Sequence, residues 1–210
     1  MIEIYIQNVN EVWFGVACTQ QQIIASSFGP SQQIVLNNIL GNISFNVPFQ
    51  VFHAPSLFAQ NILVSLMDIY RGKNVNASFD LALTHLPTYT QRVLRATAEI
   101  PLGYVTSYGS IADAVGGGPR AVGNIMAANP FAPIIPCHRV VRFDFTIGGY
   151  GGGLKVKLEL LNREKRGFST SKEIEVDGNQ LQVFPVENVL RKFFLSSKFL
   201  QAQIIKSISG

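Results

Sequence analysis

The hydrophobic pattern changes near the middle of the chain, and this change constrains the fold more than any other feature of the sequence. Three short runs in the first part alternate or are apolar throughout, as β-strands are: residues 3–7, 12–17 and 22–25. Two runs with helical spacing follow, opening after Ser31 and Ser56 and closing at Gly41 and Gly72. Strands followed by helices predict a small α/β domain over residues 1–85, with a sheet that helices cover on one face.

Short helical patterns separated by glycine and proline dominate the sequence from residue 86 to residue 167. One of them follows Thr106 or Ser107, the expected N-cap, and ends at Gly116-Gly117-Gly118. The next opens at Pro119, where a first-turn proline is tolerated. Two short helices joined by a glycine turn fit a helix-turn-helix, whose second helix can enter a DNA groove, and they also fit an ordinary helical hairpin. We predict a mainly α domain here.

The tail from residue 168 to residue 210 is predicted to be a C-terminal extension. Strand-like runs at 173–176 and 180–184 flank Asp177-Gly178, a strong signal for a β-hairpin. An amphipathic helix is expected to start near Glu187 and to carry these apolar residues: Leu190, Phe193, Phe194, Leu200, Ile204 and Ile208. Packing onto the core is the first expectation for the extension, and a surface for a partner is the second.

Composition and charge exclude several classes of protein. The 210 residues are 47% hydrophobic, which is ordinary for a globular chain and argues against disorder. No apolar run approaches the roughly 20 residues of a transmembrane helix, so no membrane partner is expected. The N-terminus lacks the features of a signal peptide and two cysteines are too few for a disulfide scaffold, so a cytoplasmic protein is predicted. Residues 91–170 carry ten basic and five acidic side chains, which favours a polyanion facing that segment.

Cys137 is the main candidate for chemistry, although a lone cysteine is more often a small buried apolar residue. Pro136 before it stiffens the backbone, and His138 after it can accept the thiol proton. Glu164 on a following helix could orient that histidine, which completes the arrangement of an activated thiol. Neighbouring side chains on extended backbone point to opposite faces, so we expect a bridging water rather than direct contact between Cys137 and His138.

The sequence around Cys137 resembles the active-site signature of the O6-alkylguanine-DNA alkyltransferases, which are methylated-DNA–protein-cysteine methyltransferases. The signature reads Asn129-Pro130, then Ile134-Ile135-Pro136-Cys137-His138-Arg139-Val140-Val141. Matching motifs lie on both sides of it in the family's order: Thr106-Ser107-Tyr108, Arg120-Ala121-Val122-Gly123, Gly148-Gly149-Tyr150, Gly152-Gly153-Leu154, and a lysine-bearing helix that ends in Glu164. The resemblance covers residues 86–166, and residues 1–85 are compatible with the family's variable α/β domain.

The resemblance implies an α/β N-terminal domain, with a small sheet and helices, followed by a mainly α domain with a winged helix-turn-helix. It implies DNA repair by direct reversal of damage, in which the protein binds the minor groove of double-stranded DNA with little sequence preference. An O6-alkylguanine would be flipped out of the stack and its alkyl group transferred to the protein's own cysteine, with O4-alkylthymine as a further substrate. The thioether product has no easy reverse path, so each molecule is expected to act once. A monomer without a cofactor is expected, near the nucleoid or, in a eukaryote, in the nucleus.

The resemblance also implies catalytic roles for particular residues. Cys137 would be the nucleophile, and His138 would act as its base through a water while Glu164 holds the imidazole in its tautomer. Tyr108 would lie against the phosphate 3′ to the target and donate a hydrogen bond to the leaving guanine. Asn129 would fix the turn between the recognition helix and the cysteine segment. Each residue also has an ordinary structural reading, as a core tyrosine, a turn residue or a helix-end carboxylate.

DNA contacts and the substrate pocket are implied in the same way. Arg120 would enter the duplex in place of the flipped nucleotide, and the remaining contacts with DNA would come from Tyr108, Ala121, Gly123 and Ala127. The backbone carbonyls of Cys137 and Val140 would accept hydrogen bonds from the guanine edge. The mobile wall of the pocket would be formed by Tyr150, Gly151 and the glycines that follow. Arg139 is expected to be structural, bonding carbonyls or a carboxylate near the junction of the two domains.

The sequence departs from the family pattern at several points. Gly151 occupies a position that is often serine, which could alter the preference for bulkier adducts. Pro133 lies one residue later than usual, so the loop is expected to be reshaped. Cys18, His53 and His85 have spacings unlike a zinc site, and no metal is expected.

Two other classes of protein remain as alternatives. A non-catalytic protein that binds alkylated DNA and recruits repair factors would resemble this family but replace the cysteine, usually with tryptophan. A thiol hydrolase of the Cys-His type would not explain Arg120 or the paired helices, and no oxyanion motif is evident. The presence of Cys137 with its neighbours intact favours the alkyltransferase.

Overall fold

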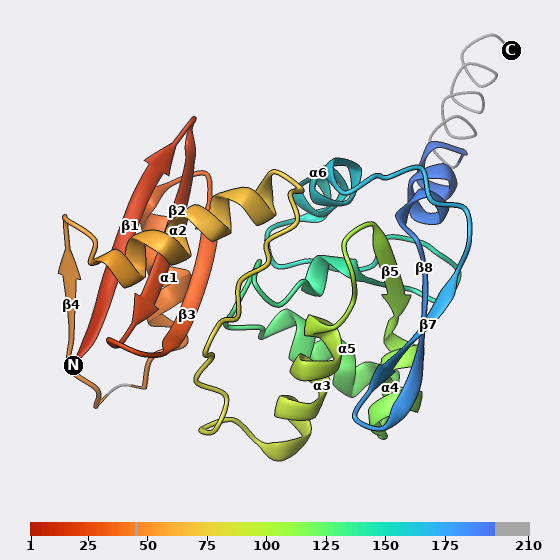
Figure 1. Cartoon of the computed structure of the whole chain (residues 1–210), viewed down its shortest axis with the longest axis horizontal. Helices are drawn as coiled ribbons and strands as arrows, with labels where there is room; N and C mark the ends of the chain where they lie inside the picture. The colour runs from red at the N-terminus through yellow and green to blue at the C-terminus, as the bar shows by residue number, and fades with distance from the viewer. Residues whose placement is uncertain (45, 196–210) are drawn as a thin grey trace, which may run out of the picture.

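The computed structural model describes residues 1–44 and 46–195, and these form two halves that lie side by side (Figure 1). The N-terminal half is a four-stranded sheet with helices against it, and the second half combines helices with another four-stranded sheet. This arrangement agrees with the predicted order of an α/β part followed by a mainly helical part. The second sheet was not predicted as a unit.

The N-terminal sheet has the strand order β3-β2-β1-β4. Its strands are β1 (Ile2–Val9), β2 (Val12–Cys18), β3 (Ile23–Gly29) and β4 (Phe49–Phe52). The first three are antiparallel neighbours, as their short turns require, and β4 returns to pair in parallel with β1. The sequence analysis missed β4 because the strand has only four residues and is largely exposed.

Helices cover both faces of this sheet, so the prediction of a single covered face is wrong. On one face, α1 (Gln32–Leu40) packs Val35 and Ile39 against alternate residues of the strands. On the other, α2 (Leu57–Tyr70) joins the main core (Figure 1). The reason is that β1 and β2 carry apolar residues on both sides of the pleat. Gly15 permits the close approach of α1, because a Cβ there would lie 2.5 Å from Val35 Cγ1.

The helix starts after Ser31, after Ser56 and near Ser107 were predicted correctly. The side chains of Ser31, Ser56 and Ser107 accept hydrogen bonds from backbone N–H groups in the first turns of α1, α2 and α4. The helices of the second half are α3 (Thr88–Ala98), α4 (Tyr108–Val115), α5 (Pro119–Ala127) and α6 (Leu154–Arg163). Between α4 and α5, Gly117 has φ +94° and its missing side chain leaves room for the Tyr89 ring.

The C-terminal hairpin is part of the second sheet, whose order is β6-β5-β8-β7. The strands are β5 (Tyr104–Ser107), β6 (Val140–Val141), β7 (Lys172–Val176) and β8 (Asn179–Pro185). β8 pairs with β5, and Thr106 Oγ1 donates a 2.7 Å hydrogen bond to the Gln182 carbonyl. The expected packing of the tail onto the core is confirmed for this hairpin. Residues 186–195 are helical as predicted, whereas Leu200, Ile204 and Ile208 lie outside the described residues.

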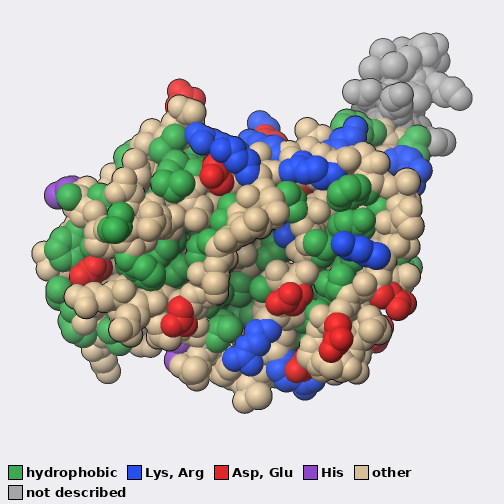
Figure 2. All heavy atoms as spheres, in the orientation of Figure 1, with side chains coloured by type: hydrophobic (Ala, Val, Ile, Leu, Met, Phe, Trp, Pro, Cys, Tyr) green, Lys and Arg blue, Asp and Glu red, His purple; other side chains and the backbone are tan. Residues whose placement is uncertain are grey.

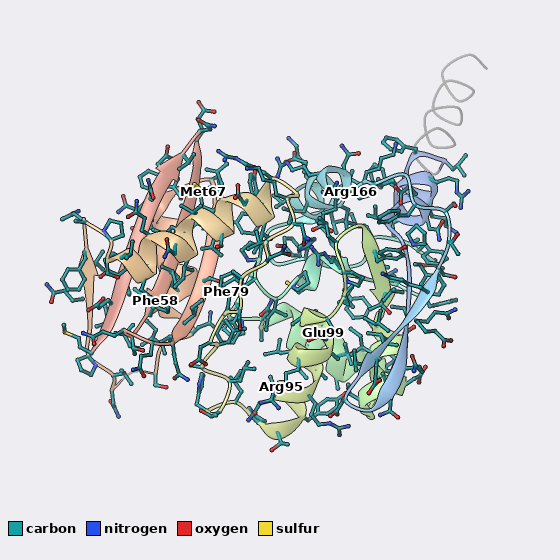
Figure 3. All side chains as sticks on the ribbon, in the orientation of Figure 1. Phe58, Met67, Phe79, Arg95, Glu99 and Arg166 are labelled. Carbon is teal, nitrogen blue, oxygen red and sulfur yellow. The ribbon has the colours of Figure 1, made fainter. Side chains whose placement is uncertain are left out.

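One apolar core runs through both halves. Phe58, Met67 and Phe79, which are labelled in Figure 3, pack against the buried cluster that also includes residues of the helical half. The backbone joins the halves as well, because Ser26 N donates to the Pro130 carbonyl at 2.9 Å and Ser26 Oγ to the Ala132 carbonyl at 3.0 Å. Strand β3 is therefore fixed directly beside the segment that leads to Cys137.

Over residues 1–44 and 46–195, no helix combines the length and apolar character needed to cross a bilayer. On the face seen in Figure 2, apolar side chains spread over the N-terminal half, and Lys and Arg side chains gather along the edge where α2 ends near α6.

The buried position of Leu181 gives a test of the hairpin's structural role. Leu181 on β8 is 0% exposed within the main core, so Leu181→Ala is expected to reduce the free energy of unfolding by about 2–5 kcal/mol. Gln182→Ala, on the next and exposed residue of the strand, is the matched control and should change it little. Urea unfolding measures both, and an unchanged stability for Leu181→Ala would contradict the packing described here.

Candidate active site

Cys137 begins a single 3-10 turn between Pro136 and β6. The turn, Cys137–Arg139, replaces the extended backbone that the sequence analysis assumed, because Pro136 at φ −80° redirects the chain. Cys137 is 6% exposed. The described residues place no hydrogen bond between the thiol and the imidazole of His138, as expected, although the reason is a turn rather than a strand.

Asn129 connects the end of α5 to the cysteine segment. Its Nδ2 donates a 2.9 Å hydrogen bond to the Ile135 carbonyl, and its Oδ1 accepts one of 3.0 Å from Phe131 N. A side-chain amide can satisfy a donor and an acceptor at once, so it replaces the regular backbone pairing that this loop lacks. The geometry agrees with the positioning that the sequence analysis expected of Asn129.

Glu164 accepts hydrogen bonds from two neighbouring residues of the turn. His138 Nε2 lies 2.8 Å from Glu164 Oε1, and both side chains are 1% exposed. Arg139 donates to the same carboxylate through Nε and Nη2, each at 2.9 Å, and its Nη1 donates to the Ile100 carbonyl at 2.6 Å. A two-pronged arginine contact of this kind fixes both position and angle. The expected bonding of Arg139 to a carboxylate and a carbonyl is confirmed.

The protonation states follow from burial and from these partners. Burial would raise the pKa of Glu164, but the positive charge available on His138 and Arg139 and their hydrogen bonds lower it to about 2. Burial lowers the pKa of His138 below its ordinary value of 6.5, although Glu164 acts in the opposite direction. At neutral pH the imidazole is therefore uncharged and donates through Nε2. Nδ1 is then a proton acceptor, and it has no partner within the described ranges.

The thiol itself is protonated at rest. Burial raises the pKa of Cys137, while Asn129 and Lys157 partly offset that effect. Since only the thiolate is a strong nucleophile, reaction at neutral pH needs a base nearby. His138 follows it directly in the turn, and its free Nδ1 suits that purpose.

A cavity of about 260 Å³ opens beside Cys137. Several of the predicted site residues line it together with Met126 and Gly149: Tyr108, Gly123, Ala127, Cys137, Tyr150 and Gly151. Val140 does not line it, and its carbonyl accepts a 2.6 Å hydrogen bond from Lys157 Nζ instead. The Cys137 carbonyl likewise accepts from Val140 N. Each oxygen keeps a second lone pair, so both can still accept from a ligand.

The exposed face of α5 leads into this cavity. Val122 and Met126 point into the core, whereas Arg120, Ala121 and Ala127 are exposed. Arg120 lies at the start of the helix with its side chain free of any hydrogen bond or ion pair to the residues that the structure describes. Gly123 and Ala127 line the cavity, and Arg120 lies one and two helical turns before them on the same face of α5.

Comparison with known proteins points to the same segment. A family model described as 6-O-methylguanine DNA methyltransferase, DNA binding domain, matches residues 88–166. A methylated-DNA–protein-cysteine methyltransferase from Mycobacterium leprae is 44% identical over 111 residues, which are 51% of this chain and 67% of that relative. The chain belongs to this methyltransferase family. The relative of the same name from Pyrobaculum aerophilum is 46% identical over 93 residues. These residues are 44% of this chain and 62% of that relative, so the chain matches just under two thirds of its length.

The architecture of both halves agrees with that of a solved family structure. The structure of Mycobacterium tuberculosis OGT in complex with DNA is similar with a TM-score of 0.63 at 25% identity. The similarity covers 78% of this chain and 92% of that one. It therefore extends beyond residues 88–166, and the combination of sheet and helices is that of the methyltransferase family.

Lys157 is a site residue of this family member that the sequence analysis did not single out. It is fully buried on α6, and its Nζ donates to the Val140 carbonyl at 2.6 Å and the Gly149 carbonyl at 3.1 Å. Burial lowers its pKa to about 8, although Cys137 acts against this. A signal was present, because Lys157 shares a helical face with the apolar residues Leu160 and Leu161. A lysine at a core-facing position needs polar partners in the interior.

In residues 1–44 and 46–195, no three His, Cys, Asp or Glu side chains are grouped so that they could hold a metal ion. Cys18 is buried, and burial raises the pKa of its thiol to about 11.

Acid unfolding tests the ionisation of Glu164. A carboxylate whose pKa falls from 4.5 to about 2 on folding stabilises the native state fully above pH 4.5 and loses that contribution as the pH falls toward 2. The contribution is about 3 kcal/mol. Urea unfolding at several pH values should show that the stability difference between wild type and Glu164→Gln shrinks over this interval. Glu159→Gln on the same helix is the control, and equal pH slopes for wild type and Glu164→Gln would contradict the buried charged network.

Proposed function

We propose that this protein repairs alkylated DNA by moving an alkyl group from O6 of guanine onto Cys137. The observation that carries the proposal is a thiol at the wall of a cavity, next to a buried His138–Glu164 pair whose free imidazole nitrogen can take a proton. The family model matches residues 88–166, and relatives at 44% and 46% identity are methylated-DNA–protein-cysteine methyltransferases. O4-alkylthymine is a further substrate of the same chemistry.

The transfer needs no metal in this proposal. The thiol proton passes through one water to His138 Nδ1, and the thiolate attacks the alkyl carbon in line with the C–O6 bond. The S–C bond forms as the C–O6 bond breaks, and the guanine leaves with its electron pair and regains a proton. Tyr108 assists as a donor, since burial raises the pKa of its hydroxyl and keeps it protonated. The thioether has no easy reverse path, so each molecule acts once.

Binding to double-stranded DNA completes the proposal. Helices α4 and α5 form a helix-turn-helix within a winged domain over residues 86–167, and the exposed face of α5 lies in the minor groove. Arg120 enters the duplex in place of the flipped nucleotide, while Tyr108, Ala121, Gly123 and Ala127 contact the backbone and the groove. Mycobacterium tuberculosis OGT, a relative of similar architecture, has been solved with DNA bound. The protein binds as a monomer with little sequence preference. Residues 1–85 form the N-terminal α/β domain, and residues 168–210 are a C-terminal extension.

Labelling of Cys137 tests the transfer. Incubation of the protein with duplex DNA that carries labelled O6-methylguanine should place one methyl group per molecule on Cys137, measured by intact mass and peptide mapping. Cys137→Ser should abolish labelling because it removes the nucleophile, whereas Cys18→Ser, at the other buried cysteine, should leave it unchanged. Removal of many methyl groups per molecule, or labelling at a different residue, would contradict the proposal.

The role of Arg120 is tested by comparing two substrates. Arg120→Ala should slow transfer from duplex DNA by about tenfold or more, because the flipped state loses the side chain that fills the stack. Transfer from free O6-benzylguanine, which needs no flipping, should change by less than about twofold. Arg95→Ala, which removes an exposed arginine from α3, is the control. Equal losses on both substrates would rule out a role in flipping.

A further inference from the structure

The C-terminal extension packs against the loop of residues 142–151, which leads from β6 to the wall of the cavity and is called the wall loop here. Gly149, Tyr150 and Gly151 at its end line the cavity beside Cys137. A buried apolar cluster joins the extension to the loop, and the following residues form it: Phe184, Val186, Val189 and Leu190 of the extension, Phe145 and Ile147 of the loop, and Val105, Val141, Leu158 and Leu161 between them. The family model ends at residue 166, so the extension's share of this cluster lies outside it.

The wall loop begins with a tight turn that holds a phenylalanine in an unfavourable backbone conformation. Phe145 N donates to the Arg142 carbonyl and Arg142 N to the Thr146 carbonyl, each at 3.0 Å. In a turn with these two bonds, the residue at the position of Phe145 adopts the left-handed conformation, for which glycine is suited. Phe145 has φ +63°. A residue with a Cβ is strained there, so contacts outside the turn must stabilise it.

Phe184 on β8 provides such a contact. Its ring lies edge-to-face against the ring of Phe145, with centroids 5.1 Å apart and an angle of 76° between the planes. Phe184 is itself fixed by the sheet, because β8 pairs it with Val105 of β5. The strained residue of the turn is therefore held by a strand of the extension.

The position of this turn determines where the cavity wall lies. Gly148, three residues after Phe145, approaches Tyr108 so closely that a Cβ there would lie 3.1 Å from Tyr108 Oη. Gly149 follows, and its carbonyl accepts a 3.1 Å hydrogen bond from Lys157 Nζ. Lys157 thus holds the later part of the wall loop, and Phe145 holds its beginning. A shift of the turn would move the wall relative to Tyr108 and Cys137, which line the same cavity.

We propose that Phe184 is a positioning residue of the transfer reaction, and that the extension uses it to hold the cavity wall in the reactive arrangement through Phe145. The inference rests on the proposed function. It gives the β7–β8 hairpin, which lies along the outer side of the helical half (Figure 1), a part in the reaction as well as in the core.

Removing the ring of Phe184 tests the inference. In Phe184→Ala the left-handed conformation of Phe145 loses the contact that stabilises it, so fewer molecules have the wall in place. Alkylation of Cys137 should become about fivefold slower or more, because the rate follows the fraction of competent molecules. The loss is expected with free O6-benzylguanine as well as with duplex DNA that contains O6-methylguanine, since both need the wall. Intact mass against time measures the rates, and urea unfolding shows that each variant is folded in the assay.

Glycine at position 145 separates positioning from general packing. The double variant Phe145→Gly/Phe184→Ala lacks both rings, but glycine adopts positive φ without strain, so its rates should return to within about threefold of wild type. Phe145→Ala/Phe184→Ala differs from it by one methyl group, keeps the strain and should stay slow. A purely structural role of Phe184 would make the two double variants equally slow, and that result would overturn the inference. If Phe184→Ala does not fold, Phe145→Gly should still react faster than Phe145→Ala in the otherwise unchanged chain.

A control within the extension is Phe168→Ala. The Phe168 ring stacks on Tyr104 of β5 with centroids 5.0 Å apart, so its removal leaves the pair of Phe145 and Phe184 intact. Its rates should stay within about twofold of wild type. Unchanged rates in Phe184→Ala, with a reactive wild type, would overturn the inference and leave the proposed function standing. Failure of the wild type to react with the methylated duplex would defeat the proposed function itself.

Discussion

The carboxylate of Glu164 is the interaction on which the site depends. It ends α6 and accepts hydrogen bonds from His138 and Arg139, two consecutive residues of the turn that begins at Cys137. Arg139 in turn reaches the Ile100 carbonyl after α3. Three segments far apart in sequence are therefore joined through one buried anion. Burying such charges is costly unless every one is paired, so loss of a single partner would leave the others without compensation.

Helix α6 holds the cysteine segment at two points. Glu164 bonds the turn itself, and Lys157, two helical turns earlier on the same face, bonds the Val140 carbonyl just after it. Lys157 also reaches the Gly149 carbonyl, which connects the glycine-rich loop to the same anchor. The short strand β6 thus has little freedom to move relative to α6. The proposed transfer to the thiol would gain directly from such restraint, because small errors in placement lower reaction rates steeply.

Local signals in the sequence predicted the secondary structure well, and pairings over long distances were missed. Ser31, Ser56 and Ser107 mark helix starts through bonds within one turn, and Asp177-Gly178 marks a hairpin by its own backbone preference. By contrast, the pairing of β8 with β5 joins segments about 80 residues apart, and no short motif encodes it. No short motif encodes the pairing of β4 with β1 either, or the packing of helices on both faces of the N-terminal sheet. For the site, the resemblance to the family predicted Cys137, His138 and Glu164. Lys157 could be found only after the structure showed which face of α6 is buried.

A protonated resting thiol has a consequence for selectivity. In the free protein, burial raises the pKa of Cys137 and the side chain is 6% exposed, so free electrophiles meet little thiolate. Proton transfer to His138 is uphill as well, because burial also disfavours the imidazolium. The ion pair of thiolate and imidazolium is therefore scarce in the free protein, and the proposed transfer favours an electrophile that is already held in line with the sulfur. In the proposed function, recognition of the substrate and activation of the nucleophile are in this way linked by the burial of the thiol and the imidazole.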